Sequence, residues 1–122
     1  MHFNKFYFDI FYLFITNIDQ QIFKNLLKFK GIVIVYNQSS ITDLSQFIKI
    51  KTFCKKKNIK FLILDNYKLA LKFELDGLVL SHNNKTHLHN KLIFKKNFTF
   101  VGKVHNQNDY YIKLNQNCSK FI

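Results

Sequence analysis

The segment Lys60–Ser81, KFLILDNYKLALKFELDGLVLS, decides the fold expected of this chain. It opens with a continuous apolar run, Phe61–Leu64, and after Asp65 it changes to helical spacing. A second apolar run, Leu78–Leu80, follows Asp76-Gly77. Short apolar runs joined by about ten residues of helical spacing are typical of β-α-β units whose parallel strands are buried on both faces. The segment therefore predicts a parallel sheet, with Asp65 at the carboxyl end of a strand, where α/β folds bind ligands.

The same alternation extends over the rest of the chain. Further strands are predicted at Phe6–Ile15, Ile32–Tyr36, Phe98–Val101 and Ser119–Ile122. A first helix is predicted at Gln20–Phe29, with a cap at Asn17 or Asp19 and Gly31 as its end. A second helix is predicted from a cap at Thr42 or Asp43 to Lys55–Asn58. Two more are predicted at Tyr67–Phe73 and at Asp109–Asn115. Between His82 and Asn97 the sequence is irregular, with at most a short helix or turn near Leu88–Ile93. This alternation of strands and helices predicts an α/β fold with right-handed crossovers, in which the sheet is either open or closed into a barrel.

Length and composition indicate one folded domain over residues 1–122. The chain is 48% hydrophobic, which excludes a disordered protein. No apolar run reaches the roughly 18 residues that a membrane helix needs, so we expect no membrane association. The apolar N-terminal stretch is interrupted by Lys5 and Asp9 and lacks a small-residue cleavage site, which favours a strand over a signal peptide.

The formal charge of +12 raises the question of a polyanionic partner. All 19 basic residues are lysines, whereas arginine is the usual residue for bidentate recognition of phosphates and bases. Bias towards A/T-rich codons explains the lysine excess, so nucleic-acid binding is not expected. The run Lys55–Lys57 is interpreted as a solvated helix end that complements the helix dipole. Cys54 and Cys118 form no disulfide or metal motif, which fits a reducing, cytoplasmic location.

Several residues are candidates for a site, each with a simpler alternative. Asp65 is a metal ligand or general base, or else an Asx turn or cap for the helix near Tyr67. His105 lines a ligand site or caps a helix, and Lys103 meets an anion at a helix start. His82, with His87 and His89, either forms part of a zinc site or belongs to a solvated loop, and the lack of a firm third ligand favours the loop.

Other chemistries are disfavoured by the sequence. Ser39, Ser40 and Ser81 have no base at a recognisable spacing, which argues against nucleophilic hydrolysis. The three glycines, Gly31, Gly77 and Gly102, are isolated, so no glycine-rich phosphate loop is present.

Four segments together resemble one known family. Phe11–Asn17 resembles an opening "YLITD" strand, and Lys60–Ser81 is similar to a segment "hhINDRhDhAhxhxADGVHLGQ". Val101–Asn106 resembles a strand and loop "hhGxSxHN", one residue shorter, and Cys118–Ile122 resembles a "GADYI" strand. These motifs, in this order, are those of the thiamine phosphate synthase / TenI family.

The resemblance implies an incomplete (β/α)8 barrel of TIM type, with roughly five and a half β/α units and parallel strands. It also implies a transferase that joins hydroxymethylpyrimidine diphosphate to thiazole phosphate, using Mg²⁺ and releasing pyrophosphate. Asp65 then corresponds to a metal ligand. The ligand-binding positions expected by the same comparison are Gln38, His82, Lys103 and His105. The open edges of such a barrel predict a covering partner, either a second copy of the chain or a complementing chain.

Several family positions carry other residues here. The cations that follow the family's second strand fall on Tyr36–Ser40, which contains none, and the second carboxylate falls on Asn84. Two alternatives therefore stand beside the synthase. One is a non-catalytic TenI-like remnant or phosphate-ligand-binding module, and the other is a basic nucleic-acid-binding protein.

Overall fold

Six strands form one parallel sheet in the order in which they occur in the chain. The computed structural model describes residues 10–17, 20–26, 28–38, 43–87 and 94–122. The strands are β1 (Phe11–Ile15), β2 (Ile32–Tyr36), β3 (Lys60–Leu64), β4 (Gly77–Leu80), β5 (Thr99–Gly102) and β6 (Lys120–Phe121). The helices are α1 (Gln20–Leu26), α2 (Ser45–Lys57), α3 (Tyr67–Lys72) and α4 (Gln107–Asn115). The predicted α/β alternation and parallel sheet are confirmed.

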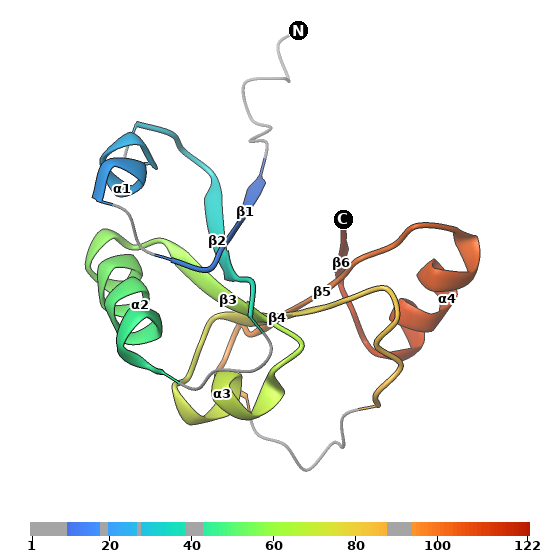
Figure 1. Cartoon of the computed structure of the whole chain (residues 1–122). Coiled ribbons are helices and arrows are strands. Elements are labelled where there is room, and N and C mark those ends of the chain that lie inside the picture. Colours follow the sequence, from blue (N-terminus) through green and yellow to red (C-terminus); the bar gives the residue numbers. More distant parts are fainter. Residues whose placement is uncertain (1–9, 18–19, 27, 39–42, 88–93) are drawn as a thin grey trace, which may run out of the picture.

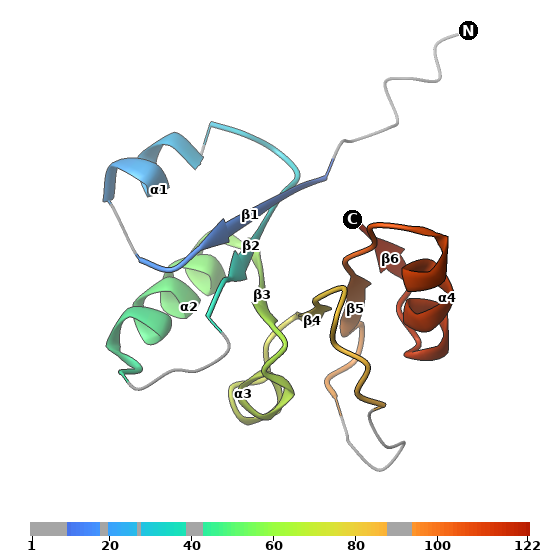
Figure 2. The same ribbon diagram turned by 45° about the vertical axis from the view of Figure 1, so that its right-hand side comes forward.

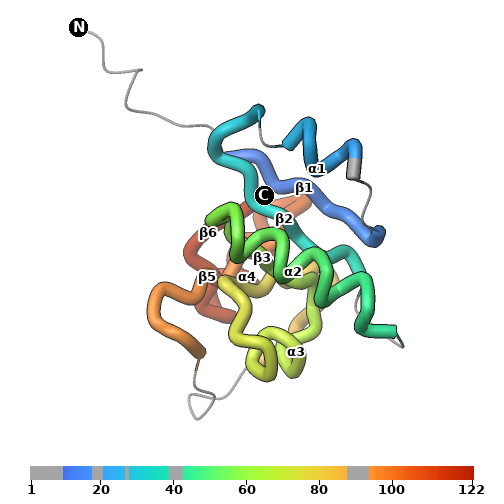
Figure 3. Tube along the Cα trace, turned by 90° about the vertical axis from the view of Figure 1, so that its left-hand side faces the viewer, coloured from blue at the N-terminus to red at the C-terminus, as the bar shows by residue number. Residues whose placement is uncertain are grey.

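The sheet is curled into an open arc with the helices on its outer side (Figures 1 and 2). Figure 2 shows α1 and α2 outside β1, β2 and β3, α3 below the arc, and α4 outside β5 and β6. Figure 3 views the same arrangement from the side of α1 and α2. The observed architecture is therefore a curled half-barrel of parallel strands.

Alternation along each strand divides the buried side chains between two clusters. Ile34, Phe61 and Ile63 pack with Phe47 and other helix residues in the cluster between sheet and helices. The intervening positions form a second cluster on the inner face of the arc: Val35, Leu62, Val79 and Val101, with Tyr12, Phe14, Val33 and Leu64 partly buried around them. The strands read as continuous apolar runs because both faces are covered.

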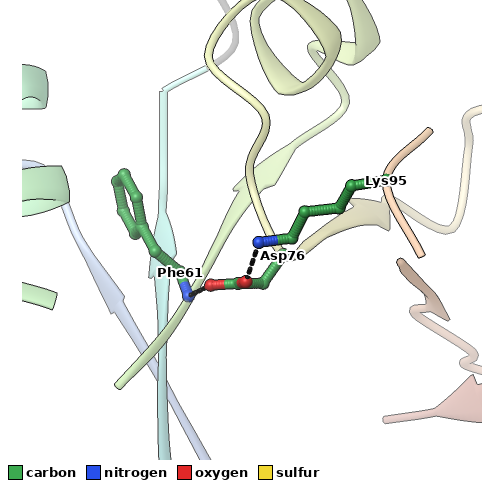
Figure 4. Close-up of polar contacts among 3 residues, drawn as sticks. All are labelled: Phe61, Asp76 and Lys95. Atoms are coloured by element: carbon green, nitrogen blue, oxygen red, sulfur yellow. Dashed lines mark hydrogen bonds and ion pairs between the residues drawn. The ribbon is translucent and has the colours of Figure 1, made fainter. Parts of the chain in front are cut away.

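Asp76 joins three strands at their amino-terminal ends, and Figure 4 shows its contacts with Phe61 and Lys95. Its carboxylate accepts a hydrogen bond of 2.8 Å from the backbone N–H of Phe61 and forms an ion pair with Lys95. Its backbone N–H donates to the Phe61 oxygen, and its backbone oxygen accepts from Thr99. Asp76 is thus a structural residue in the "ADG" part of the resemblance.

Gly77 is required by close packing within the sheet. A Cβ atom at this position would lie 2.5 Å from the backbone oxygen of Thr99 and 2.9 Å from Cγ of Leu62. No L side chain fits there without moving the backbone of the neighbouring strand. Asp76, just before β4, and Gly77, its first residue, therefore set the spacing between β3, β4 and β5.

Several predicted boundaries differ from the structure. β1 begins at Phe11, and the predicted part at Phe6–Asp9 lies outside the described residues. α1 ends at Leu26, three residues before the predicted end, and the side chain of Ile22 in it is 40% exposed. Gly31, with φ of 78°, precedes β2 and does not end α1; its oxygen accepts a hydrogen bond from Phe11. α4 begins at Gln107, two residues before the predicted start.

Asparagines stand at the end of α2 and at the start of α3. Asn58 ends α2 in the left-handed conformation, with φ of 56°, and its N–H bonds back to the helix. Asn66 caps α3 by accepting a hydrogen bond from Leu69 N–H. At the start of α2 the N-cap position is Leu44, which makes no side-chain cap bond, so the prediction of Asp43 as the cap is wrong. The carboxylate of Asp43, one residue earlier, accepts a hydrogen bond from the backbone N–H of Ser45. Thr42 and the predicted turn at Leu88–Ile93 lie outside the described residues.

Candidate functional site

Three neighbouring strands end at the same edge of the sheet, and the loops after them carry most of the predicted site residues. Asp65 follows β3, Ser81 and His82 follow β4, and Lys103 and His105 follow β5. Since parallel strands place all their carboxyl ends at one edge, these loops lie side by side. The expectation that Asp65 lies at the carboxyl end of a strand is confirmed.

Asp65 connects the β3 loop to the β4 loop. Its Oδ1 accepts hydrogen bonds from the Ser81 backbone N–H, at 2.9 Å, and from Asn84 Nδ2, at 2.8 Å. Its Oδ2 accepts from the Ser81 hydroxyl, at 2.7 Å. Asp65 has a φ of 59°, a left-handed backbone that aspartate tolerates better than most residues. The helix cap next to it is Asn66, so capping is not the role of the Asp65 side chain.

These contacts do not fit a magnesium ion on Asp65. Mg²⁺ binds oxygen atoms in near-octahedral geometry, usually through one or two carboxylates. Here Ser81 and Asn84 direct protons at both oxygens of Asp65, and Asn84 supplies an amide where the family has its second carboxylate. No group of three His, Cys, Asp or Glu side chains suited to a metal occurs within the described ranges. Magnesium binding therefore stays a prediction of the resemblance, and no chemical step is derived from it.

His82 and His105 meet across the loops after β4 and β5. Their rings are stacked, with centroids 4.1 Å apart and an interplanar angle of 25°. Both residues are exposed. His105 does not cap α4, because the cap is Asn106, whose side chain accepts from Asp109 N–H. Asp109 in turn accepts from the His105 backbone N–H, at 3.0 Å, which fixes the backbone that carries the ring.

Lys103, just after β5, contacts a residue of the cluster on the inner face of the sheet. Its ammonium group is 5.0 Å from the centre of the Phe14 ring on β1, a cation–π distance. Phe14 belongs to the inner-face cluster, so Lys103 spans from the end of β5 towards the opposite end of the arc. Lys103 is two residues from His105, and α4 begins only at Gln107. Lys103 therefore contacts Phe14 and precedes the start of α4 by four residues, and its contact with an anion stays a prediction.

Gln38 lies at the same edge of the sheet, but its hydrogen bond is separate from those around Asp65. It follows β2, is exposed, and its side-chain oxygen accepts a hydrogen bond of 3.3 Å from the Tyr36 hydroxyl. It takes no part in the hydrogen bonds around Asp65 that the structure describes. Of the other predicted residues, His87 is exposed in the loop after β4, and His89 lies outside the described residues.

Lys113 on α4 supports the β4 loop and was not singled out by the sequence. Its side chain is fully buried, and Nζ donates to the Asn84 backbone oxygen at 2.6 Å and to Gln116 Oε1 at 2.8 Å. Gln116 Nε2 also donates to the backbone oxygens of Asn84 and Thr86, each at 2.9 Å. Gly102 leaves room for the lysine, because a Cβ there would lie 2.7 Å from Lys113 Cγ.

Burial lowers the pKa of Lys113, while Cys118, Asp65 and Asp109 oppose that shift. The nearest clue in the sequence is the glycine at position 102, whose missing side chain makes space for a buried neighbour. The sequence does not indicate that this neighbour is Lys113, because a lysine on a short helix is usually exposed.

Both cysteines are free and buried. Burial raises the pKa of Cys54 to about 12 and that of Cys118 to about 11. Both thiols are therefore protonated near neutral pH and are poor nucleophiles.

Comparison with protein-family models matched no family, and comparison with curated proteins gave no significant match. In the part of the chain that the structure describes, no helix combines the length and apolar character needed to cross a membrane.

Proposed function

We propose that the chain binds small phosphorylated molecules at the carboxyl-terminal edge of its sheet. The observation that carries this proposal is the stacked pair His82 and His105, with Lys103 two residues away on the same loop. Imidazole N–H groups and an ammonium group are strong donors to phosphate oxygens, and the stacked rings offer a flat surface to a heterocycle. Asp65, Ser81 and Asn84 hold the loop beneath these groups in one conformation.

The resemblance to the thiamine phosphate synthase / TenI family supports particular ligands. They are thiazole phosphate and hydroxymethylpyrimidine diphosphate, each a heterocycle that carries phosphate. On the same ground we interpret the six-stranded arc as an incomplete (β/α)8 barrel of TIM type. Such an arc gains from a covering partner at β1 and β6, a second copy or a complementing chain. The free buried cysteines fit a reducing, cytoplasmic location.

Binding is favoured over catalysis by the contacts of Asp65. Three donated hydrogen bonds use most of the acceptor sites of its two oxygens, so its carboxylate holds a loop. The synthase reaction is the second candidate, since Asp65 lies at the end of β3, where the resemblance requires a metal ligand.

Calorimetric titration with thiazole phosphate and with hydroxymethylpyrimidine diphosphate tests the binding proposal. We expect saturable binding that Lys103→Met weakens about tenfold, since a hydrogen bond from a charged donor contributes roughly that much. Lys57→Met, at the end of α2, is the matched control and is expected to bind like the wild type. Absence of saturable binding, or an equal loss in both variants, would overturn the proposal.

A coupled assay for thiamine phosphate, with both precursors and Mg²⁺ present, decides between the two candidates. The binding proposal predicts no product. Product formation that Asp65→Ala abolishes would establish the synthase instead.

A further inference from the structure

A cavity lies at the opposite edge of the sheet from His82 and His105, where the strands begin. Its volume is about 370 Å³, within the range of small-molecule sites. The residues around it come from the end of α2, the start of β3, the α3–β4 connection and the segment before β5. Asp76, which joins the strands in Figure 4, forms part of its wall.

The charged groups around this cavity are predominantly positive. Four lysines line it against two carboxylates: Lys51, Lys55, Lys60 and Lys95 against Glu74 and Asp76. The carboxylate of Asp76 already accepts from Phe61 N–H and pairs with Lys95. Cys54 also lines the cavity, and its raised pKa keeps the thiol neutral there. An anion would therefore meet three lysines, Lys51, Lys55 and Lys60, that form no ion pair with a carboxylate in the described structure.

The wall of the cavity also has an apolar part. Phe73 and Ile59, both half-buried, contribute to it beside the lysines. An aromatic ring next to ammonium groups suits a ligand that joins a phosphate group to a flat apolar body. Because the lining comes from four segments around a concave space, it matches a small molecule better than an extended strand of nucleic acid.

We infer that this cavity binds a small phosphorylated heterocycle, such as a nucleotide, independently of the site at the carboxyl-terminal edge. Lys55 and Lys51 are one helical turn apart on α2 and approach the ligand from one side. Lys60, at the start of β3, approaches from another. The basic end of α2 thus has a use beyond complementing the helix dipole.

Titration with adenosine 5′-monophosphate, followed by calorimetry and by amide NMR signals, tests the inference. Saturable binding is expected, with shifts at Asn58, Phe61 and Asp76. Lys55→Glu is expected to weaken it about tenfold or more, because one ion contact becomes repulsive. Lys56→Glu, which changes the charge equally on the same exposed turn but does not line the cavity, is expected to stay within about twofold. Both positions are exposed, and circular dichroism checks that each variant folds.

Three results would overturn the inference. One is no saturable binding, and another is an equal loss in Lys55→Glu and Lys56→Glu, which indicates a diffuse charge effect. The third is tighter binding of a single-stranded oligonucleotide with the same dependence on Lys55, which would assign the cavity to nucleic acid. Lys103→Met, in the other site, is expected to leave the affinity for adenosine monophosphate unchanged, so the two proposals fail separately.

Discussion

The buried ammonium group of Lys113 on α4 donates a hydrogen bond of 2.6 Å to the backbone oxygen of Asn84 in the β4 loop. The side chain of Asn84 in turn donates to Asp65 after β3. One continuous chain of contacts therefore runs from a helix outside the sheet to the edge that carries His82. The conformation of that edge depends on the packing of α4 as well as on its own loops.

Replacing Lys113 with methionine tests this dependence. Methionine keeps an unbranched stem beside Gly102 but removes both hydrogen bonds, leaving Gln116 Oε1 without its donor. We expect a loss of about 1–3 kcal/mol in the free energy of unfolding, measured by urea denaturation. Lys57→Met, an exposed lysine, is expected to change stability by less than about 0.5 kcal/mol. A Lys113→Met protein as stable as the wild type would show that the buried contacts contribute nothing.

The same lysine predicts a pH dependence. Burial lowers the pKa of Lys113 in the folded protein below the ordinary value of 10.5. At pH values between the lowered pKa of Lys113 in the folded protein and 10.5 in the unfolded chain, the unfolded chain binds more protons than the folded one. The free energy of unfolding therefore rises with pH over this range. We expect the stability of the wild type relative to Lys113→Met to increase as the pH approaches 10.5. The two buried thiols act oppositely above about pH 9. Cys54 does not interact with Lys113, so its contribution cancels in the difference. Lys113 lowers the pKa of Cys118, so without the lysine this thiol destabilises the variant further at high pH, which adds to the expected rise in the difference. A difference that is flat or falls with pH would contradict the assignment.

Gly77→Ala tests the close approach of the strands. The added methyl group would meet the backbone oxygen of Thr99, which belongs to β5 and cannot rotate away. Overpacking of this kind typically costs about 1–3 kcal/mol, and we expect thermal unfolding to report a loss of that size. A substitution at Ala70 to glycine, in α3, serves as a comparison in which the loss comes from helix propensity and packing instead. Unchanged stability in Gly77→Ala would mean that β4 and β5 lie further apart.

The fold was largely predictable from the sequence, whereas the contacts of the site were not. Runs such as Ile32–Tyr36 predict buried parallel strands because both faces of the sheet need apolar residues. The end of α1 was mispredicted because Phe29, which is 63% exposed, continues the apolar pattern beyond the helix. The hydrogen-bond partners of Asp65, Ser81 and Asn84, could not be predicted because they are 16 and 19 residues away in the sequence. Only the parallel pairing of β3 with β4 brings them to the same edge.

Asp65→Asn tests whether this carboxylate holds the loop or a metal ion. Asparagine has one acceptor oxygen, so its NH₂ group would face a donor from Ser81 or Asn84. We expect a loss of about 1–3 kcal/mol in stability and faster amide exchange in the β4 loop. We also expect excess Mg²⁺ to leave the melting temperature of the wild type unchanged, because an ion that binds only the folded state raises it. Stabilisation by Mg²⁺ that disappears in Asp65→Asn would restore the metal assignment.

The central claim is that a phosphorylated heterocycle binds where β3, β4 and β5 end. An amide NMR titration of the wild-type protein with thiazole phosphate tests it most directly. The account predicts saturable shifts concentrated at Ser81, His82, Lys103 and His105, which become weak in Lys103→Met. Shifts confined to other parts of the protein, or no saturable shifts at all, would contradict it.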